Sequence, residues 1–336
     1  MKILFIAAFS SLVFSCNSTQ KTVDPKEKIV EYANTITAQD LKKHLYIYAG
    51  DEMEGRMTGT KGQHMAANYI RDFYIKEGIK PAPETDNYFQ NIPVSFFAAR
   101  RDPQPSENVL AFIKGSEKPD EIVIISAHLD HVGTDKDGNV FNGADDDGSG
   151  TVSILEIAQA FQQAVKDGNG PKRSILFLHV TGEEIGLYGS RYYTENPIFP
   201  LENTVCDLNI DMIGRIDPEK KDNPNYIYLI GSNKLSQELQ DVSTEANNKY
   251  TNLELDYKYD DPNDPNRFYY RSDHYNFAKN NVPIIFYFNG VHEDYHKITD
   301  TPDKIEYDLM AKRAQLIFYT AWEIANRDKR ITADKL

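Results

Sequence analysis

Apolar runs alternate with amphipathic stretches along most of this chain. Ile122 to Ile125 is a continuous apolar run, and Ser174 to Val180 is nearly one, as expected for strands buried on both faces of a sheet. Thr151 to Val165 and Tyr307 to Asn326 instead repeat apolar residues with a helical period. Strands alternating with helices predict a single α/β domain of three layers, an α/β/α sandwich around a mixed, largely parallel sheet.

Shorter segments complete the predicted domain. Thr37 to Asp40 can cap a helix that runs to Tyr48, and Gly62 to Gly78 repeats apolar residues on one helical face. Four further segments have the composition of strands: Tyr88 to Ser95, Asn108 to Ile113, Val205 to Ile210 and Val282 to Phe288. We therefore expect residues 37–330 to form the folded domain.

The first residues have the character of a secretory signal. Lys2 precedes the apolar run Ile3 to Phe14, which is too short to span a bilayer as a stable helix. The segment Leu12-Val13-Phe14-Ser15-Cys16 resembles a bacterial lipobox. This resemblance implies removal of residues 1–15 as a signal peptide and attachment of a lipid to Cys16. An ordinary signal peptide with an incidental cysteine is the alternative.

A lipid on Cys16 would place the protein at a membrane of the bacterial cell envelope. Residues 16–36 would then comprise the lipid-attachment site and a polar tether. Asn17, in place of an aspartate after the lipidated cysteine, favours the outer membrane, facing the periplasm. Only Cys206 would remain as a free thiol, so no intrachain disulfide could form.

Composition and charge narrow the class of protein. With 40% hydrophobic and 12% aromatic residues, the 336-residue chain can bury a large core. The formal net charge of −14 argues against nucleic-acid partners, because binding to a phosphate backbone depends on Lys and Arg.

Histidines and carboxylates follow the predicted strands. Open α/β sheets place their chemistry beyond the carboxyl ends of the strands. We expect these residues at that edge: His128, Asp130, Glu183, Glu184, Asp211 and His296, together with Asp145, Asp146 and Asp147 in the loop before the helix that begins at Thr151. Imidazole and carboxylate are zinc ligands, so the set predicts a hydrolase with a pair of metal ions.

Each motif has a simpler interpretation when it is taken alone. Thr181 to Glu184 fits a helix capping box, and Asp211 could cap a strand end. The spacing of Asp145, Asp147 and Glu156 matches an EF-hand calcium loop. An EF-hand needs a helix directly before the loop, whereas residues 140–144 have the composition of a turn. Calcium binding is therefore the weaker interpretation.

The order of the motifs resembles the M28 family of zinc metallopeptidases. The motifs, from first to last, are His128-x-Asp130, Asn142-Gly-Ala-Asp-Asp-Asp-Gly-Ser-Gly150, Thr181-Gly-Glu-Glu184, Asn209-x-Asp-Met-Ile-Gly214, Ser272-Asp-His274 and Tyr295-His296. The similarity extends from Asp51 to about Lys304, nearly the whole expected mature chain. The resemblance implies a zinc exopeptidase fold in one catalytic domain.

The resemblance also implies a role for each residue. Asp146 would bridge two zinc ions per chain, followed by a cis peptide bond. The other ligands would be His128 and Asp211 at one ion, and Glu184 and His296 at the other. Glu183 would act as the general base on a water between the ions, Tyr295 would stabilise the oxyanion, and Asp130 would orient His128.

Peptides are therefore the expected substrates, and hydrolysis next to the N-terminus is the first choice. A carboxypeptidase or dipeptidase would need a cation for the substrate carboxylate, and Arg191, Arg215, Arg267 or Arg271 could supply it. Cyclisation of N-terminal glutamine at a single zinc, and a noncatalytic binding module, are further alternatives. Segments 216–225 and 259–271 are expected to shape the pocket, and the side-chain preference is left open.

Five other residues are assigned lesser roles. His131 and His292 are expected to be loop residues, the former either lining the pocket or merely exposed, and His179 a buried core histidine. Asp273 is expected to hydrogen-bond near the site, and Asp300 to orient His296.

Overall fold

The structure is a computed structural model of the chain, and it describes residues 25–85, 87–97 and 104–335. Within these residues the strands are β1 (Lys80–Pro81), β2 (Phe89–Ile92), β3 (Ser106–Ile113), β4 (Lys118–His128), β5 (Arg173–Val180), β6 (Thr204–Ile210), β7 (Tyr226–Ile230), β8 (Glu254–Asp256) and β9 (Ile284–Phe288). They form one sheet in the order β1-β3-β5-β4-β6-β9-β7-β8, with β2 paired to β3.

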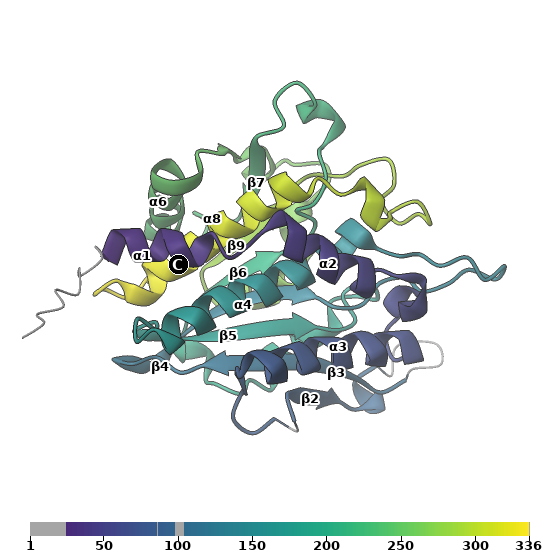
Figure 1. Cartoon of the computed structure of the whole chain (residues 1–336), viewed down its shortest axis with the longest axis horizontal. Coiled ribbons are helices and arrows are strands. Elements are labelled where there is room, and N and C mark those ends of the chain that lie inside the picture. Colours follow the sequence, from purple (N-terminus) through teal and green to yellow (C-terminus); the bar gives the residue numbers. More distant parts are fainter. Residues whose placement is uncertain (1–24, 86, 98–103, 336) are drawn as a thin grey trace, which may run out of the picture.

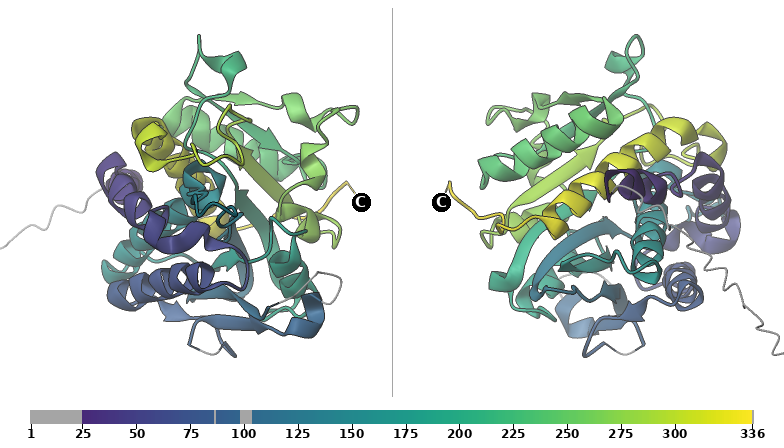
Figure 2. Two further views of the ribbon diagram at one scale, coloured as in Figure 1. Left: turned by 90° about the vertical axis from the view of Figure 1, so that its right-hand side faces the viewer. Right: turned by 60° about the vertical axis from the view of Figure 1, so that its left-hand side comes forward.

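The sheet is mixed, with a parallel centre. β5, β4, β6 and β9 run in the same direction, whereas β3 is antiparallel to β5 and β7 is antiparallel to β9. The four parallel strands therefore end at one edge, at the right of Figure 1 and facing the viewer in the left view of Figure 2. The topology confirms the predicted α/β class.

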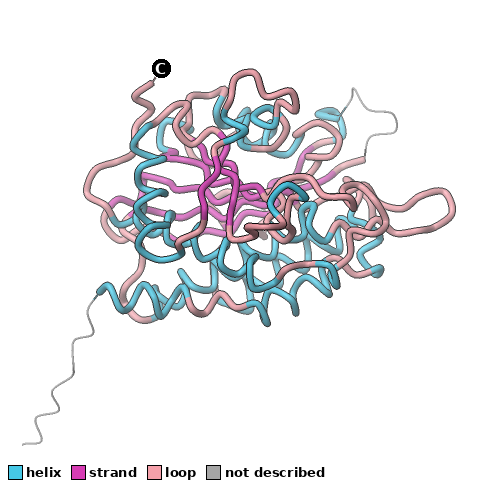
Figure 3. The backbone as a smooth tube through the Cα atoms, turned by 90° about the horizontal axis from the view of Figure 1, so that it is seen from above, coloured by secondary structure: helices cyan, strands magenta, loops and turns pink. Residues whose placement is uncertain are grey.

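Helices cover both faces of the sheet unequally. They are α1 (Pro25–Ala33), α2 (Ala38–Tyr48), α3 (Lys61–Glu77), α4 (Gly150–Lys166), α5 (Tyr188–Glu195), α6 (Gln237–Ala246), α7 (His274–Ala278) and α8 (Tyr307–Asn326). Residues of α1 to α4, α6 and α8 share one apolar cluster with the sheet, and α5 and α7 contribute to the cluster on the opposite face. Figure 3 shows the strands between a thick helical layer and a thinner layer of loops and short helices.

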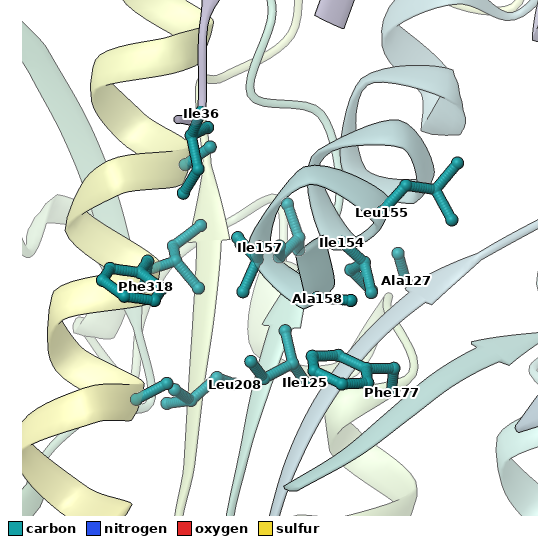
Figure 4. Packing of buried hydrophobic residues seen from close by; sticks show 14 of the residues in the cluster. Ile36, Ile125, Ala127, Ile154, Leu155, Ile157, Ala158, Phe177, Leu208 and Phe318 are labelled. Atoms are coloured by element: carbon teal, nitrogen blue, oxygen red, sulfur yellow. The ribbon is translucent and has the colours of Figure 1, made fainter. Parts of the chain in front are cut away.

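Successive residues of the central strands pack into different layers. In β4, Val123 and Ile125 belong to the cluster below α4 and α8, whereas Ile122 and Ile124 belong to the cluster on the opposite face. Figure 4 shows Ile125 facing the helical layer. Complete burial of such a side chain contributes about 1.5–3 kcal/mol. Burial on both faces explains why this strand is a continuous apolar run rather than an alternating one.

Most of the predicted elements are present with small shifts at their ends. The expected cap of α2 is confirmed, since the Thr37 hydroxyl accepts a hydrogen bond from the amide of Asp40. α8 has the predicted bounds. β2 is shorter than the predicted strand 88–95, because the chain turns at Pro93 into a 3-10 helix, Val94–Phe97.

The expected tether is corrected in its second half. Residues 25–33 form α1, in which Ile29, Tyr32 and Ala33 are buried against the core. The Tyr32 hydroxyl also donates to Asp167, 3.1 Å away. The many charged residues of this short helix concealed its narrow apolar face. At the other end Ile331 is also buried, so the folded domain extends beyond the expected 37–330 on both sides.

The proposed signal peptide and Cys16 lie outside the described residues, so their processing remains a prediction. Among the helices of the described part, none is long and apolar enough to cross a membrane.

Candidate metal centre

The predicted site residues meet at the carboxyl edge of the parallel strands. β4 ends at His128, and Asp130 and His131 follow it. The turn after β5 carries Glu183 and Glu184, and Asp211 follows β6 directly. The remaining members are Asp146 in the turn before α4, and Tyr295 and His296 in the loop after β9. The topology therefore brings together residues that are up to 168 positions apart, from 128 to 296.

Asp146 lies between two groups of donor atoms. Its Oδ1 is 3.2 Å from Nε2 of His128, and its Oδ2 is 3.0 Å from Nε2 of His296. One carboxylate thus faces both groups that the resemblance implied. The peptide bond between Asp146 and Asp147 is cis, as expected.

The first group contains His128 and Asp211. Nε2 of His128 lies 3.7 Å from Oδ1 of Asp211, and the imidazole is completely buried. Its other nitrogen, Nδ1, faces the main-chain oxygen of Asp130 at 3.1 Å. A partner on Nδ1 fixes the ring orientation and leaves Nε2 directed at the two carboxylates.

The second group contains an additional histidine. Glu184 places Oε2 3.0 Å from Nε2 of His296 and Oε1 2.7 Å from Nδ1 of His131. The His131 side chain is fully buried, and its Nδ1 is 3.8 Å from Oδ2 of Asp146. From the sequence, His131 was expected either to line the pocket or to be merely exposed. Its position three residues after His128, just beyond the same strand, was the available signal.

Several of these buried atoms have no hydrogen-bond partner. They are Nε2 of His128, both ring nitrogens of His131, Oδ2 of Asp146 and Oε1 of Glu184. Buried polar side-chain atoms in folded proteins are nearly always hydrogen-bonded, so a cluster of orphans facing one another needs an explanation. Nitrogen and carboxylate oxygen are the donors that zinc prefers outside thiolate sites. The residues present therefore fit a metal centre.

Asp147 is also near the first group, but its carboxylate is already used. The side chain accepts hydrogen bonds from the backbone amides of His128, Gly150 and Met212, at 3.2, 2.9 and 3.1 Å. These bonds tie the ends of β4 and β6 to the start of α4. Asp147 shapes the site, whereas the carboxylate of Asp146 remains available to a metal.

Asp145 turns away from the cavity, and this geometry contradicts an EF-hand. Its Oδ1 accepts the amide of Gly214 at 2.6 Å, and its Oδ2 lies 3.1 Å from Nε2 of His292. Glu156 instead pairs with His44 of α2, with Oε1 3.2 Å from Nε2. The three residues therefore do not converge on a calcium ion. His292 is buried and supports this turn, a role that its loop position did not suggest.

Asp300 supports Asp146 rather than His296, which corrects the expectation. Its buried carboxylate accepts the amide of Asp145 at 3.0 and 3.1 Å and the amide of Asp146 at 3.2 Å. Nη1 of Arg215 lies 4.0 Å away. Burial, reinforced by the neighbouring Asp145 charge, raises the pKa of Asp300 to about 6.

Asp130 positions Glu183 without facing the cavity. Its Oδ1 accepts the amide of Glu183 at 3.2 Å, and its Oδ2 accepts the Thr58 hydroxyl at 2.7 Å. Asp130 is fully buried. Asp130 therefore has a positioning role in the site. Its main-chain oxygen lies 3.1 Å from Nδ1 of His128, and its Oδ1 lies 3.8 Å from the same nitrogen, so Asp130 also faces His128 as expected.

The carboxyl group of Glu183 faces the cavity. Burial, together with the negative charges of Glu184 and Asp211, raises the pKa of Glu183 well above its usual range, against the opposing effect of His128. The alternative capping box at Thr181 to Glu184 does not form, because α5 begins only at Tyr188. The chain between Thr181 and Tyr188 is a turn, in which the amide of Tyr188 donates to the main-chain oxygen of Gly182.

The cavity is lined by both acidic and apolar side chains. Its lining consists of Asp146, Glu183, Asp211, Met212, Phe268, Arg271, Phe286, Phe288, Val291 and Tyr295. Phe268 and Arg271 come from the segment expected to shape the pocket, whereas none of 216–225 appears in this lining. The Tyr295 ring stacks on that of His296, with ring centroids 4.0 Å apart.

Two residues outside the cluster have the expected surroundings. His179 is buried in β5, with Nε2 2.7 Å from the Tyr74 hydroxyl, and burial lowers its pKa to about 3. Asp273 accepts a hydrogen bond from the Ser190 hydroxyl at 2.5 Å, and burial raises its pKa to about 7.

A parallel-centred α/β sheet with buried imidazoles and carboxylates at its carboxyl edge defines the class of metal-dependent α/β hydrolases. Residues 108–321 match peptidase family M28, and this stretch is more than half of the chain. The chain therefore belongs to peptidase family M28.

The chain is similar to individual members of curated families and to solved structures. A probable zinc metalloprotease of Pyricularia oryzae is 26% identical over 274 residues, covering 68% of this chain and 52% of that protein. The chain thus spans about half the length of this curated relative. The LapA aminopeptidase of Legionella pneumophila has a similar fold, with a TM-score of 0.69 and 18% identity over 98% of this chain and 81% of that one. A glutaminyl cyclase of Bacteroides thetaiotaomicron is also similar, with a TM-score of 0.63 and 16% identity over 85% and 98% of the two chains. Fold alone therefore does not distinguish hydrolysis from cyclisation.

Proposed function

We propose that this chain is a di-zinc aminopeptidase that hydrolyses the N-terminal peptide bond of peptides. The observation that carries the proposal is the position of Asp146, whose two oxygens lie 3.2 Å from His128 and 3.0 Å from His296. A carboxylate that faces two separate donor groups is suited to hold two metal ions together, as in co-catalytic metal sites.

The donor groups divide as follows. Asp146 would be shared, His128 and Asp211 would hold one zinc ion, and Glu184 and His296 would hold the other. His131 supplies a further nitrogen beside Glu184. Zinc bound here would supply Lewis acidity, which polarises a peptide carbonyl and lowers the pKa of water.

Glu183 is the proposed general base and acid. It would take a proton from the attacking water and give it to the leaving amine, so it must both gain and lose a proton near neutral pH. Burial raises the pKa of Glu183 well above its usual range, in the direction that this double role requires. Asp130 accepts the amide of Glu183 and so fixes the main chain from which this carboxylate projects.

Tyr295 is the proposed oxyanion donor. Its ring lies against His296, and the residue lines the cavity together with Glu183. A phenol donates a hydrogen bond to negative charge that develops on the carbonyl oxygen.

The choice of the N-terminal end rests on the relatives. A probable leucine aminopeptidase of Arthroderma benhamiae is 30% identical over 231 residues, covering 66% of this chain and 58% of that protein. A carboxypeptidase or dipeptidase is the second candidate, because Arg271 lines the same cavity. Arg215 does not serve this purpose, since it already pairs with Asp294 at 2.8 Å.

The decisive variant is Glu183→Gln. We expect it to lose turnover of an aminoacyl anilide while elemental analysis still finds about two zinc ions per chain, the number typical of co-catalytic sites. Glu293→Gln is a matched control, because Glu293 is an exposed carboxylate in the loop that carries His296. Normal turnover by Glu183→Gln would refute the proposed mechanism.

Two further measurements separate the alternatives. Faster cleavage of an N-blocked dipeptide than of an aminoacyl anilide would favour a carboxypeptidase. Cyclisation of N-terminal glutamine by a protein with a single zinc would indicate a cyclase instead. Zinc binding with neither activity would indicate a binding module.

We also propose that Cys16 carries a lipid that anchors the enzyme to the envelope membrane, in the outer membrane and facing the periplasm. The support is the lipobox-like segment that ends at Cys16, followed by Asn17. The mature protein should enter the detergent phase on partition, and Cys16→Ser should move it to the aqueous phase. Aqueous partition of the wild type would contradict the anchor.

A further inference from the structure

We propose that Arg271 binds a carboxylate of the substrate beside the scissile bond. The carboxylate is either the free C-terminus of a very short peptide or the acidic side chain of its first residue. This inference rests on the proposed peptidase function and adds a substrate class to it.

The exposed guanidinium of Arg271 lies at the cavity. Arg271 lines it together with Glu183 and Tyr295. Its Cζ lies 5.0 Å from the centre of the Phe268 ring, and its Nη2 is 3.5 Å from the Tyr295 hydroxyl. The aromatic ring favours a cation over its face and limits the positions that the long side chain takes.

The charge of Arg271 has no carboxylate partner. Among the described residues, no carboxylate oxygen lies within 4.0 Å of its nitrogens, although Asp146, Glu183 and Asp211 line the same cavity. Those carboxylates face the metal centre, so they are not available to neutralise the guanidinium. Arg215, by contrast, is paired on the protein.

The surroundings of Arg271 favour an anionic ligand group. The neighbouring wall consists of Met212, Phe286, Phe288 and Val291, which offer no polar contact through their side chains. Arg271 is exposed at the mouth of this lining, where a substrate can reach it. A guanidinium binds a carboxylate through two parallel hydrogen bonds. The cavity therefore combines an apolar side-chain pocket with one cationic group.

The other arginines considered from sequence face elsewhere. Arg191 stacks on the rings of Phe96 and Tyr188, each 4.5 Å away. Arg267 lies over Tyr270 at 5.0 Å and lines a separate hollow. Arg267 is thus a suitable control, since it has the same charge on the same loop but does not line the metal cavity.

The test compares substrates that differ only in a carboxylate. One arm pairs Leu-Leu with Leu-Leu amide, and the other pairs glutamyl anilide with leucyl anilide. Arg271→Ala should raise KM about 10- to 100-fold for the carboxylate member of one pair, the range expected on losing a charged hydrogen bond. The neutral member should change less than about twofold. Arg271→Lys should have a KM for the carboxylate substrate between those of the wild type and Arg271→Ala. Arg267→Ala should have the KM of the wild type for every substrate.

The affected pair identifies the source of the carboxylate. An equal loss of kcat on every substrate, as in Tyr295→Phe, would mean that Arg271 acts by holding Tyr295, and this outcome overturns the proposal. No effect on either pair overturns it as well.

A binding measurement keeps this inference separate from the proposed function. Calorimetry with Leu-Leu, Leu-Leu amide, glutamyl anilide and leucyl anilide is carried out on zinc-loaded Glu183→Gln, with and without Arg271→Ala. A carboxylate-dependent loss of affinity, about 10- to 100-fold, supports the role of Arg271 even if the wild type cleaves no peptide. Equal affinities in the two proteins contradict it, whatever the activity.

Discussion

Removal of the Asp300 carboxylate tests whether the bridging aspartate is held by the protein before any metal binds. Asp300 is fully buried and accepts three hydrogen-bond contacts from the amides of Asp145 and Asp146, between 3.0 and 3.2 Å. Asp300→Ala leaves both amides without this acceptor. Asp300→Asn keeps the shape and one oxygen.

The structure sets the size of the expected effect. A buried amide that loses its partner costs about 1–3 kcal/mol, so Asp300→Ala should lower the free energy of unfolding by about 2–6 kcal/mol. Asp300→Asn, which retains one acceptor, should lose about 1–3 kcal/mol. Loss of a residue that supports a metal ligand typically weakens metal binding about 10- to 100-fold.

Urea unfolding of the metal-free protein measures the stability change, and competition with a chelator measures zinc affinity. Asp303→Asn is the control, since Asp303 is exposed and only three residues away. The reasoning fails if Asp300→Asn and Asp300→Ala both unfold at the wild-type urea concentration and retain zinc as tightly. Lower stability with unchanged zinc affinity would show that Asp300 supports the fold but not the position of Asp146.

Three further outcomes follow from the geometry. Tyr295→Phe should lower kcat about 100-fold in single-turnover measurements, with zinc content unchanged, because one oxyanion donor is lost. His131→Asn should lower the zinc content found by elemental analysis, since its Nδ1 is 2.7 Å from Glu184; wild-type content would exclude it as a ligand. The folded pKa of His179 is about 3, below the unfolded value of about 6.5, so unfolding takes up a proton and stability should fall as pH drops from about 6.5 toward 3. At pH 5 the lost contribution of His179 to the free energy of unfolding reaches about 2 kcal/mol, which urea unfolding can measure. This loss should be absent in His179→Gln, and an equal pH dependence in both proteins would contradict the prediction.

The elements that position the site were predictable because burial leaves a strong pattern. β4 and β5 are buried on both faces, which produces nearly continuous apolar runs. His128 is the last residue of β4, and Glu183 follows β5 closely. Parallel strands bring their carboxyl ends to one edge, so assembly of the site followed from strand identity alone. By contrast, α1 has only a narrow buried face, and its other residues are mostly charged. Its sequence is therefore similar to that of a polar tether.

Side-chain partners within the site were harder to predict, because adjacent residues can face opposite ways. His131 follows the same strand as His128, and only the course of the chain after β4 places it beside Glu184. Asp300 was correctly linked to the site but assigned to the wrong partner. Its carboxylate contacts backbone amides, and every residue except proline has such an amide, so the sequence does not indicate which amides Asp300 will contact.

The three consecutive aspartates show how the structure assigns roles that spacing leaves open. The backbone leaves helical geometry at Asp146 and Asp147, with φ and ψ of −103° and 100°, and −114° and 45°. Their side chains consequently diverge: Asp145 toward Gly214 and His292, Asp147 toward three backbone amides, and Asp146 into the cavity. A carboxylate already bonded to amides has little capacity left for a metal, so the number of amide donors distinguishes the bridging residue from its neighbours. Assigning the proposed metal-bridging role to Asp145 or Asp147 would therefore place it on a carboxylate that is already occupied.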